Sequence, residues 1–97
     1  LNWFAAYYRI GKVSTGFEVW ISNSQFNDDY TQYQAEIAFD DSTVPHQRTI
    51  LVCMNPEKDY QVTFNGKVVE SKTYHQGLLE ITLPSTNKSG KLTVTSV

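Results

Sequence analysis

The stretch "YQVTFNGKVVE", residues 60–70, decides the fold class because it reads as two short strands joined by a tight turn. Both central residues of a two-residue type I′ turn need a positive φ, and the pair Asn65-Gly66 adopts such values readily. Apolar and polar residues alternate through the five residues before the turn, as in a strand with one buried face. The stretch therefore predicts a β-hairpin.

Working outward, further strand-like stretches recur about every ten to fourteen residues, which is the spacing of a sandwich or barrel. They lie at residues 17–22, 30–39, 48–54, 77–84 and 91–97. Polar stretches such as 22–29 and 40–47 are expected to be loops, because Asn, Ser and Asp bond to their own backbone. The first ten residues fit a strand or a helix, and the β-rich remainder favours the strand. The sequence predicts an all-β, antiparallel, immunoglobulin-like β-sandwich of about seven to eight strands.

Composition and chain ends limit the partners of this single domain, residues 1–97. The net charge is −2 and the eight Lys and Arg residues are scattered, whereas nucleic-acid binders gather them on one face. No apolar run approaches the ~20 residues of a membrane span. The first residues contain no Met and no basic leader, which suggests a processed chain or an excised fragment. We therefore expect a module of a larger protein that contacts neither nucleic acid nor membrane.

The residues that commonly carry chemistry are few and lie in ordinary contexts. Cys53 falls in the strand-like "TILVCMN", so we expect a buried, unreactive thiol and no internal disulfide. His46 and His75 lie in loops, and no HExxH, GxSxG or Cys-His spacing accompanies them. The sequence predicts no catalytic residue, no metal ligand and no cofactor. A rival interpretation places an enzyme site in the loops around His46, Asp40 and Asp41.

Two acidic loops and one sequon leave further alternatives open. The loops at 27–29 and 40–41 lie at opposite ends of one predicted strand, roughly 30 Å apart at ~3.3 Å per residue. They cannot share a calcium ion, and solvated turn carboxylates explain them better than a site at either loop alone. Asn87 begins an Asn-Lys-Ser match, which accepts a glycan only in a eukaryotic secretory route.

The outward face of two predicted strands carries the strongest functional hint. Large aromatics stand there among amides and carboxylates, a combination that suits sugars because rings stack on aromatic planes and amides bond to hydroxyls. The predicted carbohydrate-binding residues are Trp20, Tyr30, Gln32, Gln34 and Glu36. The alternative is packing: the face would be covered by the chain's own first residues or by a neighbouring domain.

The segments "RTILVCMNPEKDYQVTFNGKVVE", "GLLEITLP" and "GKLTVTSV" together carry a resemblance. They are similar to the C-terminal all-β modules appended to bacterial glycoside hydrolases and polysaccharide lyases. Those modules often show "Y-x-V-x-x-N/D-G-K", then an "L-x-I-x-L-P" strand and a final strand. The resemblance covers roughly the last half of the chain and touches no catalytic residue. It implies a non-catalytic domain of a secreted or periplasmic glycan-degrading protein.

These observations lead to one expected function and one alternative. We expect a non-catalytic accessory module of a carbohydrate-active protein, which packs against a neighbouring domain of its parent chain and has polysaccharide contact as a second role. The alternative is an adhesion or protein-binding module that pairs with its partner through an exposed strand edge.

Overall fold

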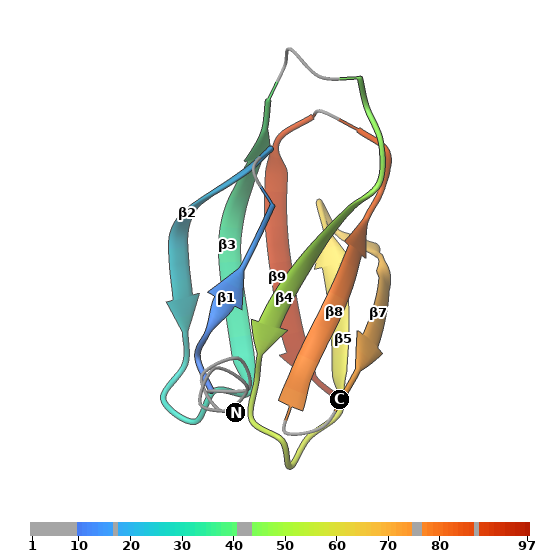
Figure 1. Cartoon of the computed structure of the whole chain (residues 1–97). Helices are drawn as coiled ribbons and strands as arrows, with labels where there is room; N and C mark the ends of the chain where they lie inside the picture. The colour runs from blue at the N-terminus through green and yellow to red at the C-terminus, as the bar shows by residue number, and fades with distance from the viewer. Residues whose placement is uncertain (1–9, 17, 41–43, 75–76, 87) are drawn as a thin grey trace, which may run out of the picture.

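The computed structural model describes residues 10–16, 18–40, 44–74, 77–86 and 88–97. These residues form nine strands in two antiparallel sheets, which pack face to face as a sandwich (Figure 1). The predicted all-β sandwich is confirmed. The number of strands exceeds the expected seven to eight because two short strands, at residues 13–14 and 70–73, were not expected. The predicted strand or helix over the first residues falls almost wholly outside the described ranges.

The two sheets differ in size and strand order. The smaller sheet has the order β1-β4-β8-β7 and is made of β1 (Val13–Ser14), β4 (Arg48–Cys53), β7 (Glu70–Thr73) and β8 (Leu78–Leu83). The larger sheet has the order β2-β3-β9-β5-β6 and is made of β2 (Val19–Phe26), β3 (Gln32–Phe39), β5 (Tyr60–Phe64), β6 (Lys67–Val68) and β9 (Gly90–Ser96). The predicted central position of the 48–54 strand is confirmed, since β4 lies between β1 and β8.

The strand order follows the immunoglobulin sandwich with one change. Immunoglobulin domains place strands A, B, E and D in one sheet and C, F and G in the other, with C′ beside C in variable-type domains. Here β1 takes position A, and β4 to β9 take B, C, C′, D, E and F in chain order. The position beside F, which strand G fills in those domains, is filled by β3, which precedes B in the chain. β2 then extends this sheet by one further strand.

The hairpin at residues 60–70 forms as predicted, and its second half changes sheet. Asn65 and Gly66 have φ values of 54° and 81°, so both central turn positions are left-handed, as a type I′ turn requires. β6 pairs with β5 for two residues only, and Val69 still donates its N–H to the Val62 carbonyl. The next residues, β7, pair with β8 in the other sheet. The stretch therefore supplies strands to both layers.

The core lies between the layers and is built from the alternating residues that the sequence predicts. Along β3 every second residue is buried, and the four are Tyr33, Ala35, Ile37 and Phe39. The opposite layer contributes the fully buried Ile50, Val52, Leu79, Ile81 and Leu83, and β9 contributes Leu92 and Val94. The outward residues of β3 are exposed, so its predicted division into a core face and an outer face is confirmed.

Candidate functional site

The outer face of the larger sheet carries rows of polar side chains across neighbouring strands. Gln34 on β3 pairs with Gln25 on β2 and with Thr93 on β9, and its Nε2 donates to Gln25 Oε1 at 3.2 Å. One row further along, Gln32 pairs with Thr95. All these residues are exposed or half-buried. The register therefore gathers amide and hydroxyl groups from three strands on one surface.

A β-bulge in β2 brings Gln25 into this surface and corrects one prediction. Residues 22–29 were expected to be a loop, but β2 continues to Phe26. The register shifts between Ser22 and Gln25, so Asn23 and Ser24 together oppose one residue of β3. Asn23 has a left-handed φ of 51°, a value that its short polar side chain tolerates, and its Nδ2 donates to Glu36 Oε2. The Asn- and Ser-rich composition therefore marks a bulge rather than the end of the strand.

The turn after β2 is fixed by one side chain at the end of the surface. Asn27 Oδ1 accepts the backbone N–H groups of Thr31 and Gln32, each at 2.9 Å, and its Nδ2 donates to Thr31 Oγ1 at 2.9 Å. Thr31 Oγ1 donates in turn to Asp29 Oδ1 at 2.6 Å, and this bond is the main reason that the pKa of Asp29 is lowered. The turn carboxylate is thus satisfied within its own loop.

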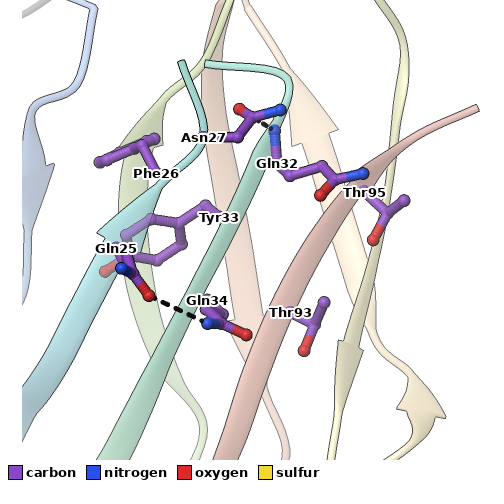
Figure 2. A pocket seen from close by; sticks show the side chains of 8 residues that line it. All are labelled: Gln25, Phe26, Asn27, Gln32, Tyr33, Gln34, Thr93 and Thr95. Carbon is purple, nitrogen blue, oxygen red and sulfur yellow. Dashed lines mark hydrogen bonds between the residues drawn. The ribbon is translucent and has the colours of Figure 1, made fainter. Parts of the chain in front are cut away.

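These elements border a shallow depression of about 300 Å³ (Figure 2). Its lining residues are Gln25, Phe26, Asn27, Gln32, Tyr33, Gln34, Thr93 and Thr95. Beneath it, the Tyr33 ring packs against Phe26 with a centroid distance of 4.5 Å, and its hydroxyl lies 2.8 Å from Ser24 Oγ. Burial raises the pKa of Tyr33, so this phenol remains neutral. Amides and hydroxyls that can bond to a polar ligand therefore stand on the outer face of strands whose core face carries this aromatic packing.

Four of the five predicted carbohydrate-binding residues lie on this outer face, at different distances from the depression. Gln32 and Gln34 line it, and Glu36 follows two residues further along β3. Trp20 pairs with Ala38 and is 63% exposed. Ala38 is four residues from Gln34, which is about 13 Å along a strand. The face thus carries its amide cluster and its aromatic side chain at separate places.

Tyr30, the fifth predicted residue, does not lie on this face, so the orientation predicted for its side chain is wrong. It precedes β3 and has a left-handed φ of 58°, which ends the alternation on which the prediction depended. Its half-buried ring lies 5.2 Å from the Phe26 ring, and a Cβ added to Gly11 would lie 3.0 Å from it. Its carbonyl accepts the N–H of Asn55 at 2.9 Å. Tyr30 therefore joins the end of the sandwich.

We expect Trp20 to be readily quenched by acrylamide when its fluorescence is recorded in a Trp3→Phe background. The reason is its 63% exposure on the outer face of the edge strand β2. The measurement compares its quenching constant with those in urea-unfolded protein and in N-acetyltryptophanamide. A native value far below both references would mean that another surface covers this face in solution.

A charged cluster at the other end of β3 has a structural explanation. The buried Arg48 places its guanidinium 4.7 Å from the Phe39 ring centroid, and its Nη1 donates to the Thr86 carbonyl at 2.8 Å. Glu18 Oε2 lies 3.3 Å from Arg48 Nε and 2.8 Å from Nε2 of the exposed His46. A buried guanidinium requires such partners. These contacts tie the loop before β4 to the sandwich.

The remaining predictions concern the cysteine, further loop residues and the absence of a metal site or membrane span. Cys53 is buried as predicted, and burial raises the pKa of its thiol. Asp41, His75 and Asn87 lie outside the described residues. Among the residues that the structure describes, no three His, Cys, Asp or Glu residues lie together so that they could hold a metal ion. In the same part of the chain, no helix is long and apolar enough to cross a membrane.

Comparison with known proteins gives no relative: no protein-family model, no curated protein and no solved structure matches the chain.

The site includes residues that the sequence did not indicate. Gln25 lies in the stretch that the sequence predicts to be a loop. The pair Gln25-Phe26 nevertheless continues the alternation of outward and inward residues after the bulge. Thr93 and Thr95 alternate with buried residues in the last strand and could have been predicted to point outward. Their position beside Gln34 and Gln32 could not, because it depends on the pairing of β3 with β9.

Proposed function

We propose that the chain is a non-catalytic accessory module of a secreted or periplasmic carbohydrate-active protein, and that it contacts glycan through the outer face of its larger sheet. It would pack against a neighbouring domain of its parent chain with another part of its surface. The observation that carries the proposal is the gathering of amide and hydroxyl groups from β2, β3 and β9 around one depression.

The chemistry of this surface supports a sugar ligand. Side-chain amides can donate and accept hydrogen bonds at once, as can threonine hydroxyls, and sugar hydroxyl groups need both. The three glutamines Gln25, Gln32 and Gln34 and the threonines Thr93 and Thr95 stand within one continuous register (Figure 2). None of the described residues that line this depression carries an ionised side chain. A neutral, hydroxyl-rich ligand matches such a lining better than a charged one.

The shape of the surface supports a binding module. The depression is shallow and lies over the strands of one sheet, where a chain can rest without being enclosed. Small-molecule sites are usually concave pockets that bury most of the ligand. Trp20, at the far end of the same face, offers an exposed aromatic plane for a sugar ring.

The proposal is tested by isothermal titration calorimetry with neutral oligosaccharides, namely hexasaccharides of β-1,4-linked glucose, xylose and N-acetylglucosamine and of α-1,4-linked glucose. We expect at least one series to bind, and Gln34→Ala to weaken that binding by about three- to tenfold, as for one lost hydrogen bond. Gln47→Ala is the matched control, because Gln47 is exposed just before β4 of the smaller sheet and is not among the residues that line this depression. Equal effects of the two variants would contradict the proposed site.

A second candidate function, binding of a protein partner at a strand edge, has its own observation. β2 pairs with β3 alone within the described part of the chain. Exposed edge strands are usually protected from pairing by proline or by charged side chains. The eight residues of β2, VWISNSQF, contain neither, although the bulge interrupts the strand. Hydrogen exchange at the β2 amides should then be slower in the parent protein than in the isolated chain. Unchanged exchange would exclude strand addition at this edge by a neighbouring segment of the parent protein.

A further inference from the structure

Two more depressions continue the first along the outer face of the larger sheet. The second, of about 230 Å³, is lined by Asn23, Gln34, Ala35, Glu36 and Lys91. The third, of about 330 Å³, is lined by Ser22, Glu36, Ile37, Ala38, Ser89, Gly90 and Lys91. Gln34 borders the first and second, while Glu36 and Lys91 border the second and third. The three depressions therefore lie in a row along β3, and we call this row the β3 groove.

The β3 groove runs parallel to β3 and is long compared with a single sugar ring. Its lining follows β3 from Gln32 to Ala38. These residues are six apart, which is about 20 Å along a strand. Trp20 stands directly opposite Ala38 on β2, with its side chain exposed, so an aromatic plane lies at the far end of the groove. An extended chain that follows β3 can contact the glutamines at one end and Trp20 at the other.

The charges and sizes of the lining residues limit further the kinds of ligand that the groove can bind. Glu36 and Lys91 are Cα partners across β3 and β9, so one acidic and one basic residue meet in the middle of the groove. Their formal charges cancel, and the rest of the lining is uncharged. The depression that includes Ala38, the Cα partner of Trp20, is lined mostly by small residues, among them Ser89 and Gly90.

We infer that the β3 groove binds an extended, neutral oligosaccharide segment parallel to β3, with amide contacts at Gln25, Gln32 and Gln34 and ring stacking at Trp20. This inference rests on the proposed function and adds to it the form and the charge of the ligand. Internal stretches of a polysaccharide, rather than single terminal sugars, are the expected targets. A polyanionic glycan would meet no excess of positive charge in the groove.

The test uses the oligosaccharide series that binds best, from the monosaccharide to the hexasaccharide, with native protein and the variants Trp20→Ala and Gln34→Ala. Affinity should rise with chain length by about tenfold or more from the disaccharide to the hexasaccharide, as further contacts are made. Both variants should weaken the binding of the hexasaccharide. A disaccharide is long enough to contact only one end of the groove, so its affinity should be changed by only one of the two variants. Trp20→Phe, which keeps an aromatic plane, should retain most of the affinity, and Gln47→Ala should behave as native protein. The three side chains that are replaced, Trp20, Gln34 and Gln47, are exposed, so unchanged urea midpoints establish that the variants fold.

The outcomes separate the inference from the proposed function. Disaccharides that bind as tightly as hexasaccharides, with no effect of Trp20→Ala on any length, would overturn the extended ligand while the glycan site at Gln34 stands. Tighter binding of a polyuronate hexasaccharide than of the neutral hexasaccharide would overturn the assignment of a neutral ligand. Native protein that binds no oligosaccharide of any series would overturn both the proposed function and the inference.

Discussion

Replacement of Gly77 with alanine is expected to lower the free energy of unfolding by about 4 kcal/mol or more, the range reserved for severe clashes and strain in a folded interior. Gly77 is buried and has a φ of 79°. A Cβ at this position would lie 2.1 Å from the Met54 carbonyl oxygen and 3.1 Å from the Pro56 nitrogen. Both are backbone atoms, and the Gly77 carbonyl accepts the Met54 N–H at 2.8 Å, so the two segments cannot separate without losing this bond.

Gly66→Ala provides the matched control for this prediction. Gly66 has nearly the same φ, 81°, but a Cβ there would meet no atom within 4 Å. Its replacement should therefore cost only the strain of a left-handed alanine, about 1–2 kcal/mol. Urea unfolding followed by circular dichroism measures both losses. If the Gly77→Ala chain is unfolded even without urea, the expected result is obtained in its extreme form. Equal losses of unfolding free energy in the two variants would contradict the close approach of Gly77 to the Met54 backbone.

Ile37→Ala should lower the free energy of unfolding by about 2–5 kcal/mol, as for other large-to-small changes in a packed core. Ile37 is 1% exposed at the middle of β3 and belongs to the central apolar cluster. Ile21 on β2 and Gly90 on β9 are its Cα partners, so the truncated side chain would leave a cavity that the paired strands can close only in part.

The control for Ile37→Ala is Gln34→Ala on the same strand. Gln34 is exposed on the outer face, so its replacement should cost under about 0.5 kcal/mol. Denaturant midpoints, compared at equal m-values, give the ranking. A larger loss for Gln34 than for Ile37 would invert the two faces of β3, and the β3 groove would then be part of the interior.

Local patterns in the sequence predicted the fold class because they reflect local physical requirements. The alternation of apolar and polar residues from Tyr33 to Phe39 arises because the side chains of a strand point alternately to its two faces. The pair Asn65-Gly66 is suited to the positive φ values that a hairpin turn requires. Both were confirmed. Trp20 and Gln34 were likewise assigned to the outer face from alternation alone.

The remaining features depend on contacts between distant segments or on exceptions to alternation. The bulge at Asn23 and Ser24 inserts one residue, which composition alone cannot distinguish from a loop. Tyr30 leaves the pattern because the Asn27 side chain holds a turn there. The neighbours of β3 in the sheet depend on pairing with β9, which lies more than fifty residues away in the sequence. The groove is therefore a property of topology, and single-strand patterns could supply only its outward-facing residues.

The placement of β3 in the position that strand G fills elsewhere has a consequence for how the chain is made. On the ribosome, β2 and β3 emerge before the other strands of the larger sheet, yet they join β5 and β6 only through β9. The sheet that contains the β2–β3 hairpin therefore cannot be completed until β9 has been synthesised. Such distant pairing makes folding slow compared with that of locally connected proteins. Until β9 emerges, the early hairpin has an unpaired edge that chaperones or neighbouring nascent chains can contact.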